Sequence, residues 1–359
     1  MTCADSNSFP GSAVYTLLDA ASSLLRKALP FNTYRRLSRW YTWAVDEPNA
    51  LLQAAYLAVM NGGFGAALAC AFPRVPCGTL AAHHKWFGVF GYAVCMASFV
   101  QACVAPPGRI IDAASVAKHD NYLFDGVLFV PGRICETAGV PKLARSKFDR
   151  VARSNVSRFD HFCPWLCAPI GEENYRWFLL FLLAHAAFLA YGAFACAQLL
   201  REVFIVEDLA GATFYNAATQ QAAEASPLVI AQYLLSRDRA ICALLLLCIV
   251  MSVVVAVFLA FHLWLVKCGM TTNEFYKWRD AASDRQRRGE SPPPRGAERF
   301  YDLGSFAKNL HEVLMPRSLR PDALARATAA GADARRRAAP PPRDPQTGAP
   351  AGQPRKRRN

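Results

Sequence analysis

The sequence is poor in charged residues, and four long stretches of it contain none. Only 19% of the 359 residues are Asp, Glu, Lys or Arg, whereas 53% are hydrophobic. Since about 20 apolar residues are enough to cross a bilayer as a helix, the uncharged stretches predict four membrane-spanning helices and exclude a chain of ordinary soluble domains. Buried core helices are the alternative, and this alternative applies most to the first stretch, which is rich in Gly and Ala. The stretches are residues 51–72, 86–105, 177–200 and 240–266.

Histidine is also scarce inside these stretches, where only His185 and His262 occur. A transport path through a membrane is normally marked by ionisable groups. A transporter or channel is therefore disfavoured. His185 and His262 are each interpreted as a helix-packing or interfacial residue. No signal peptide is visible, since the N-terminus is polar and the first apolar run starts late. Residues 13–29 instead show the apolar spacing of an amphipathic helix on a membrane surface.

Acidic residues are outnumbered, with 27 Asp and Glu against 40 Lys and Arg, for a formal net charge of +13. Residues 316–359 contribute +8 of that charge, because they hold eleven Lys or Arg and three Asp. We interpret this Pro-, Ala- and Arg-rich segment as a disordered basic tail that suits an anionic membrane leaflet. No nucleic-acid partner is predicted.

The distribution of Lys and Arg predicts how the chain lies in the membrane. Residues 106–176 and both flanks of the apolar region are basic, whereas residues 201–239 carry three Arg against five acidic residues. Because cytosolic segments are enriched in Lys and Arg, we expect both termini and residues 106–176 in the cytosol. Residues 201–239 would then be lumenal or extracellular. The predicted fold class is an all-α integral membrane protein with four transmembrane helices.

A compact motif in the central loop, just before the third apolar stretch, reads Asp-His-Phe-Cys-Pro-Trp and spans residues 160–165. A thiol reacts as the thiolate and therefore needs a base. A carboxylate that orients an imidazole, which in turn serves a nucleophile, meets that need. We interpret Cys163 as the nucleophile, His161 as its base and Asp160 as the group that orients His161. A structural cysteine beside a loop histidine is the alternative.

Two further motifs follow in order along the chain. Thr-Thr-Asn-Glu occupies residues 271–274, and an aromatic and Asn-containing run extends from Tyr301 to Asn309. With the first motif, this layout over residues 50–315 resembles the DHHC family of protein S-acyltransferases (palmitoyltransferases), whose core motif is Asp-His-His-Cys-Pro-Trp. Within this resemblance the chain would be a variant, since Phe162 stands in place of the second histidine.

The resemblance implies a two-step reaction and a role for each motif residue. Cys163 would take an acyl chain, usually palmitoyl, from acyl-CoA as a thioester and pass it to a cysteine of a substrate protein. His161 would be the general base and Asp160 its orienting partner. Thr272 would support Asp160 by a hydrogen bond, and Asn309 would be a structural residue that tethers the C-terminal segment near the loop.

The expected partners are palmitoyl-CoA, membrane-associated substrate proteins and the lipid bilayer, in an endomembrane such as the endoplasmic reticulum or Golgi. Acyl-CoA would be a co-substrate, and no further cofactor is expected. Arg153 and Arg158 could meet the CoA phosphates, or could lie on a solvated face of the loop.

The zinc ligands that the family normally carries in this loop are largely missing. Such Cys and His ligands hold a loop that has little hydrophobic core of its own. Cys135 remains, but the other expected ligand positions hold different residues, and we predict that no family-type zinc site forms. Apolar packing would then replace the metal. The replaced positions are Ala138, Phe148, Asp149, Ala152, Asn155, Phe162 and Pro169.

The expected organisation divides the chain into six parts. They are residues 1–50 as an N-terminal region, 51–105 as transmembrane helices 1 and 2, 106–176 as the DHHC-type catalytic loop, 177–266 as helices 3 and 4, 267–315 as the C-terminal motif region, and 316–359 as the tail. A catalytically weak or dead scaffold that binds acyl chains or partner proteins is the alternative to the enzyme.

Overall fold

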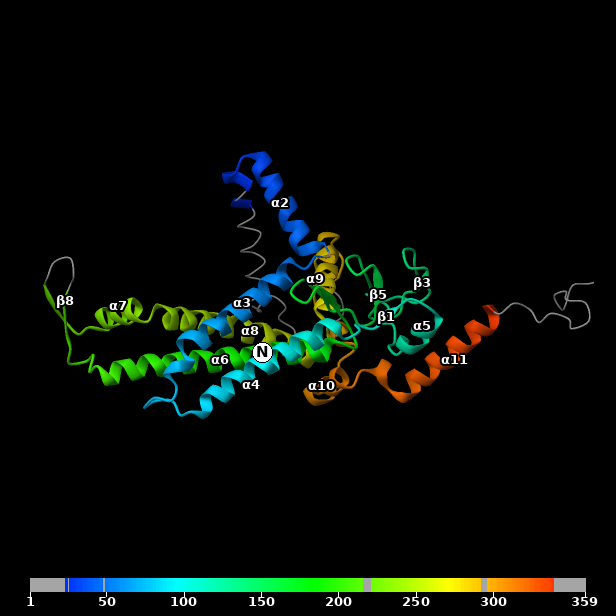
Figure 1. Cartoon of the computed structure of the whole chain (residues 1–359). Helices are drawn as coiled ribbons and strands as arrows, with labels where there is room; N and C mark the ends of the chain where they lie inside the picture. The colour runs from blue at the N-terminus through cyan, green and yellow to red at the C-terminus, as the bar shows by residue number, and fades with distance from the viewer. Residues whose placement is uncertain (1–22, 25, 48, 216–220, 292–295, 339–359) are drawn as a thin grey trace, which may run out of the picture.

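The computed structural model describes residues 23–24, 26–47, 49–215, 221–291 and 296–338, and it is mostly helical (Figure 1). Within these ranges, four helical segments are long and apolar enough to cross a membrane, which confirms the predicted multi-pass helical architecture. They are α3 (Leu51–Cys70) with the 3-10 turn η1 (Phe72–Arg74), α4 (His83–Val104), α6 (Tyr175–Val206) and α8 (Arg239–Lys267).

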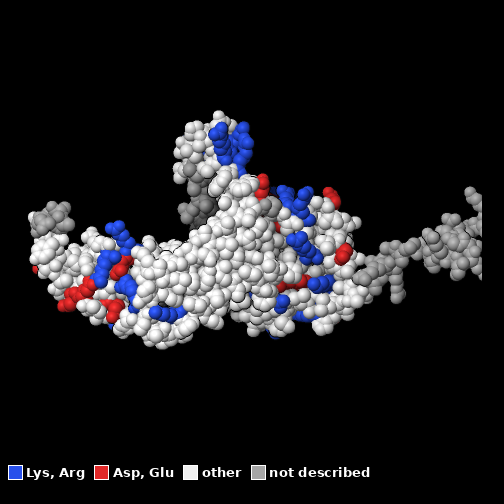
Figure 2. Space-filling view, viewed as in Figure 1, with Lys and Arg blue, Asp and Glu red and all other residues white. Residues whose placement is uncertain are grey.

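The four long helices lie side by side as one bundle, in which α6 packs along both α4 and α8. Apolar residues cover the outer faces of these helices as well as the inner ones; on α8, for example, Leu246, Val253 and Val257 are all more than half exposed. A helix that is apolar all round needs an apolar surrounding. Figure 2 shows charged side chains gathered at the two ends of the bundle, with an uncharged surface between them. Both observations fit a bundle surrounded by lipid.

The connection between α4 and α6 adds short antiparallel strands to the predicted all-α architecture. Strands β1, β5 and β4 form one small sheet, and β2–β3 and β6–β7 form two separate pairs. Each strand is only two or three residues long, because closely spaced turns interrupt it. The bounds are β1 Arg109–Ile110, α5 Ala113–His119, β2 Ile134–Cys135, β3 Val140–Pro141, β4 Lys147–Asp149, β5 Ser154–Val156, β6 His161–Cys163 and β7 Ala168–Ile170.

This loop and the C-terminal elements gather at the same end of the bundle (Figure 1). The C-terminal elements are α9 (Thr272–Arg287), η2 (Ala297–Arg299), α10 (Phe306–Leu314), η3 (Arg317–Leu319) and α11 (Pro321–Ala338). The opposite end holds β8 (Thr213–Tyr215), β9 (Ala222–Glu224) and α7 (Pro227–Arg237), within the predicted lumenal loop. Helix α2 (Phe31–Asp46) precedes the bundle, while most of the amphipathic helix predicted over residues 13–29 lies outside the described residues.

The prediction of a disordered tail over residues 316–359 is wrong for its first half, because α11 is a helix that packs against α5. Ala323 is fully buried in that contact, and Arg326 donates to the carbonyl oxygen of Ala117 at 3.3 Å. Composition alone suggested disorder, whereas burial against α5 supplies the stabilisation that composition does not reveal. Residues 339–359 lie outside the described residues.

Candidate active site

The Asp-His-x-Cys motif lies on the hairpin formed by β6 and β7. In this hairpin His161 pairs with Ile170 and Cys163 with Ala168. Since side chains alternate between the two faces of a strand, residues two apart point to the same side. The spacing of His161 and Cys163 therefore directs the imidazole and the thiol to one face, and Phe162 to the other.

Asp160 is held between His161 and the N-terminus of α9. Its Oδ2 atom lies 2.6 Å from Nδ1 of His161 and accepts a 2.9 Å hydrogen bond from Oγ1 of Thr272. Its Oδ1 atom accepts a 2.7 Å hydrogen bond from the backbone N–H of Thr272, and its carbonyl oxygen accepts from N–H of Asn273 at 3.1 Å. The first N–H groups of a helix have no partner inside the helix and favour a negative charge. Here the carboxylate of Asp160 accepts from the N–H of Thr272, and the backbone carbonyl oxygen of Asp160 accepts from the N–H of Asn273.

The Thr-Thr-Asn-Glu motif is the capping box that starts α9. Oγ1 of Thr271 accepts from N–H of Glu274 at 3.2 Å, and Oε2 of Glu274 accepts from N–H of Thr271 at 2.9 Å. A capping box satisfies two otherwise unpaired donors and fixes where a helix begins. The motif thus sets the position of Thr272, and through it the position of Asp160.

The electrostatics of this pair favour charge separation between Asp160 and His161. Burial by itself raises the pKa of Asp160, but the hydrogen bonds from His161 and Thr272 outweigh it and bring the pKa below its ordinary value. Burial also lowers the pKa of His161, yet its interactions with Asp160 and the Cys163 thiol raise that pKa above its ordinary value of 6.5. A histidine with a raised pKa is a stronger base toward a neighbouring thiol.

Cys163 lies where this polar cluster meets an apolar cavity of about 610 Å³ inside the bundle. Cys163 is only 4% exposed and packs in a cluster with Phe178 and Leu182 of α6. The cavity also contacts Trp165, two residues after Cys163, and His84 in the first turn of α4. A volume between about 300 and 1,000 Å³ is typical of small-molecule sites, and the apolar lining suits a hydrocarbon chain.

A buried arginine that no sequence motif marks connects the loop to α9. Nε and Nη2 of Arg145 donate to the two carboxylate oxygens of Glu274 at 2.7 and 2.6 Å, and both side chains are at most 2% exposed. The guanidinium also lies 4.3 Å from the ring centre of Tyr301. The carbonyl oxygen of Arg145 accepts a 3.1 Å bond from N–H of Phe159, next to Asp160. Arg145 therefore joins the motif strand to the capping box.

Asn309 tethers the C-terminal segment to the end of α8 rather than directly to the loop. Its Nδ2 atom donates to the carbonyl oxygen of Lys267 at 3.1 Å and to Oδ1 of Asp302 at 2.8 Å. Gly269, with a φ of 68°, lets the backbone of Asp302 pack close to the end of α8, since a Cβ atom at Gly269 would lie 2.6 Å from Cα of Asp302. The two hydrogen bonds of Asn309 join Asp302 to the last residue of α8, and the role of Asn309 as a tether near the loop stays a prediction.

Arg153 and Arg158, considered for the CoA phosphates, have different surroundings. Arg153 is exposed, whereas Arg158 is only 5% exposed, and neither Nε nor Nη1 of Arg158 has a hydrogen-bond partner among the described residues. A buried guanidinium of this kind is not available to a solvated phosphate, so the interpretation fails for Arg158.

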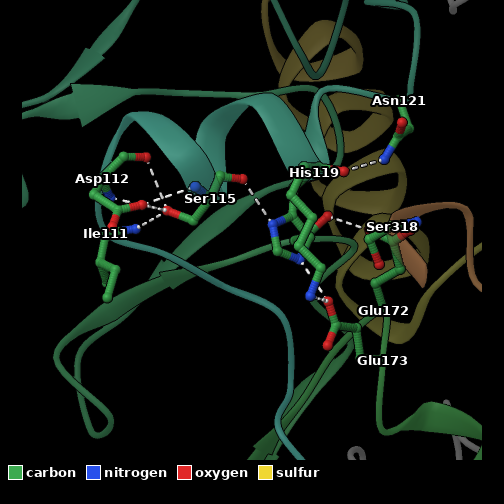
Figure 3. A network of polar contacts seen from close by, with 10 residues as sticks. Ile111, Asp112, Ser115, His119, Asn121, Glu172, Glu173 and Ser318 are labelled. Atoms are coloured by element: carbon green, nitrogen blue, oxygen red, sulfur yellow. Dashed lines mark hydrogen bonds and ion pairs between the residues drawn. The ribbon is translucent and has the colours of Figure 1, made fainter. Parts of the chain in front are cut away.

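Polar contacts bind the loop to its neighbours (Figure 3). His119, at the end of α5, contacts Oε1 of Glu173 through Nε2 at 2.9 Å. Glu172 accepts from Oγ of Ser157 at 2.6 Å and from N–H of Ser318 at 3.0 Å, which connects the residue after β5, the segment before α6, and η3. Paired and buried groups of this kind fix a loop in one arrangement.

The residues at the expected zinc-ligand positions do not fit Cys/His zinc sites. Asp149 accepts a 2.8 Å bond from N–H of Ala152 and so closes the turn between β4 and β5. Cys135 is buried in β2. Across the described part of the chain, no group of three or more His, Cys, Asp or Glu side chains is arranged to hold a metal ion.

The comparisons with known proteins agree with these motifs. Residues 129–279 match the family described as DHHC palmitoyltransferase. The chain is 29% identical to palmitoyltransferase SWF1 of Yarrowia lipolytica over 55% of its length, covering 50% of that protein. It is 34% identical to palmitoyltransferase ZDHHC4 of Mus musculus over 61% of its length, covering 64% of that protein. It is 30% identical to palmitoyltransferase SWF1 of Neurospora crassa over 55% of its length, covering 47% of that protein.

The chain thus spans about half to two thirds of the length of the curated relatives it matches. The matched segment contains the hairpin with Asp160, His161 and Cys163 as well as the capping box of α9. The similarity to the DHHC palmitoyltransferase family is thus carried by residues 129–279.

Proposed function

We propose that this chain is a membrane-embedded protein-cysteine S-palmitoyltransferase that carries the acyl group on Cys163. The observation that carries the proposal is the position of this thiol. It lies beside the Asp160–His161 pair and at the wall of an apolar cavity inside the helical bundle. A nucleophile and a hydrocarbon site that share one residue suit the transfer of a fatty acyl chain.

In the first step, His161 takes the proton of the Cys163 thiol, and the thiolate sulfur attacks the carbonyl carbon of acyl-CoA. The carbon–sulfur bond to CoA breaks, and the CoA sulfur leaves with a proton from His161. In the second step, a substrate cysteine gives its proton to His161, attacks the Cys163 thioester and takes the acyl chain. Cys163 recovers its proton from His161. Asp160 stabilises the imidazolium in both steps.

The acyl chain would bind in the cavity, where each buried methylene contributes about 0.8 kcal/mol. The loop, both termini and the C-terminal elements would lie in the cytosol, and the end with α7 would lie in the lumen of the endoplasmic reticulum or Golgi. The excess of Lys and Arg in residues 106–176 supports this orientation. The substrates would be cysteine-containing proteins at the same membrane face.

The proposal is tested with the purified full chain in detergent or vesicles and a clickable palmitoyl-CoA analogue. We expect a hydroxylamine-sensitive label on the wild type and its transfer to an added cysteine peptide. A wild type that takes no label would refute the enzyme and favour a scaffold that only binds acyl chains.

Replacing Thr272 by Val is expected to slow labelling about tenfold, because a hydrogen bond to a charged group contributes roughly 1.5–3 kcal/mol. Valine removes the Oγ1 bond to Asp160 but keeps the backbone N–H bond. Thr272→Ser, which retains the hydroxyl, should label at close to the wild-type rate. Equal losses in the Ser and Val variants would contradict this role.

We also propose that the loop folds without zinc, held by packing and by its buried polar pairs. Metal analysis of the purified full chain should then find far less than one zinc per chain. A chelator should leave both the melting temperature and the labelling rate unchanged, since no metal-coupled folding is involved. Stoichiometric zinc whose removal lowers the melting temperature would overturn this proposal.

A further inference from the structure

We propose that His262, on the membrane-spanning helix α8, is a positioning residue that holds His161 in its reactive orientation. This inference rests on the proposed acyl transfer and adds a residue that lies outside the sequence motifs. From the sequence, the place of His262 in an uncharged apolar stretch predicts only a packing or interfacial residue.

The ring of His262 forms part of the wall around the ring of His161. The two ring centres are 5.8 Å apart, and Phe178 of α6 contacts both rings edge to face, at 5.1 Å from His161 and 4.9 Å from His262. His262 is 1% exposed. The rings of Phe258 and Phe261 pack against it from the same helix. His161 therefore has a histidine, rather than a further hydrocarbon ring, on one side.

A hydrogen bond from α6 fixes the orientation of His262. Oη of Tyr175 lies 3.0 Å from Nδ1 of His262, and both residues are buried. Nε2 of His262 is buried and has no hydrogen-bond partner among the described residues. A buried polar atom without a partner costs roughly 1–3 kcal/mol, a cost that a phenylalanine at this position would avoid. A polar ring kept at such a cost points to a role beyond packing.

The contact reaches the reactive groups through His161. The titratable groups that interact with His262 are Asp160 and His161 from the loop and Tyr175 from α6. His161 must keep Nδ1 toward Asp160 while its other nitrogen exchanges a proton with Cys163. A fixed ring beside His161 opposes its rotation away from Asp160. A polar ring in a dry site also acts on a charged imidazole with little screening.

The test compares His262→Phe, Tyr175→Phe and the double variant with the wild type. Phenylalanine at position 262 preserves the aromatic volume, so a packing role predicts unchanged behaviour. We expect about tenfold slower labelling by the palmitoyl-CoA analogue in His262→Phe, at a wild-type melting temperature. Tyr175→Phe should produce a smaller loss, and the double variant should be no slower than His262→Phe, because both changes act through one contact.

A second measurement separates this inference from the proposed function. The rate at which iodoacetamide modifies Cys163, followed by mass spectrometry of its peptide, reports the thiol–imidazole pair without acyl transfer. We expect the pH midpoint of this rate to shift in His262→Phe and, in the same direction, in Tyr175→Phe. Unchanged midpoints in both variants would overturn the role of His262, even if the wild type is an active transferase.

The outcomes remain distinct if one variant does not fold. Tyr175→Phe removes a single hydroxyl and then carries the test alone, so a wild-type pH midpoint in it refutes the inference. A wild type that takes no acyl label while its Cys163 midpoint still responds to both substitutions would refute the transferase and leave the role of His262 intact.

Discussion

Replacing Asp160 by Asn is expected to slow acyl labelling of Cys163 by a factor on the order of 10² or more. A neutral amide cannot stabilise the imidazolium that forms when His161 takes the thiol proton. The change also removes the negative charge that the N-terminus of α9 favours through N–H of Thr272. The measurement is the initial rate of hydroxylamine-sensitive labelling in the purified full chain.

Asp149→Asn is the matched control for this variant. Asp149 is a buried carboxylate of the same loop, and its carboxylate accepts from N–H of Ala152, a contact that an Asn side-chain oxygen can replace. Its variant should label within about twofold of the wild type, as a preserved turn contact costs little. Equal losses in the two variants would show that Asp160 matters only for folding.

Asp160→Asn is also expected to change how the stability of the protein depends on pH. The pKa of Asp160 is lowered, so its contribution is complete above its ordinary value of 3.8 and is lost as the pH falls toward the folded-state pKa. The pKa of His161 is raised, so its contribution is complete below 6.5 and is lost as the pH rises through the folded-state pKa. The melting-temperature difference between wild type and Asp160→Asn should therefore be largest between about pH 4 and 6.5.

Arg145→Met is expected to cause the largest loss of stability, about 3–5 kcal/mol, because it leaves the buried carboxylate of Glu274 without its partner. The damage should extend to the active site, since Glu274 belongs to the capping box that positions Thr272. Labelling should fall together with the melting temperature in detergent. Because the loss of stability comes from the unpaired carboxylate of Glu274, a second substitution that removes this charge should reduce the loss.

The double variant Arg145→Met/Glu274→Gln provides that relief, because glutamine removes the buried charge and can still accept in the capping box. It should recover part of the lost stability. The exposed pair Arg287–Asp284, on the same helix α9, supplies a control. Arg287→Met should change the free energy of unfolding by at most about 0.5 kcal/mol. A double variant less stable than Arg145→Met would contradict the assigned pair.

The membrane helices could be predicted because each is an uncharged run of sufficient length, and the structure follows those runs to within a few residues at most ends. The third helix extends six residues past its predicted end, to Val206, since Arg201 and Glu202 continue it beyond the apolar run. The short strands of the loop could not be predicted. Pairs of two or three residues leave no periodic pattern in a sequence.

Asp160, His161 and Cys163 could be proposed as site residues because their chemistry is local in sequence. Because side chains alternate between the faces of a strand, the spacing of two residues would also have predicted that His161 and Cys163 share one face. Arg145 and His262 carried no such signal. Arg145 is one of many basic residues in its loop, and its partner Glu274 lies 129 positions away. His262 lies in an apolar run, so its contact with His161 depends on how α8 packs against the loop.

The most direct test of the account is the site of acylation, measured by labelling full-length wild type, Cys163→Ala and Cys167→Ala with the same palmitoyl-CoA analogue. Cys167 lies four residues away on the same hairpin, and its thiol contacts the carbonyl oxygen of Asn49 at 3.3 Å. If Cys163 carries the acyl group, we expect a hydroxylamine-sensitive label on the wild type and Cys167→Ala, and none on Cys163→Ala. A Cys163→Ala protein that labels as strongly as the wild type would contradict this role of Cys163.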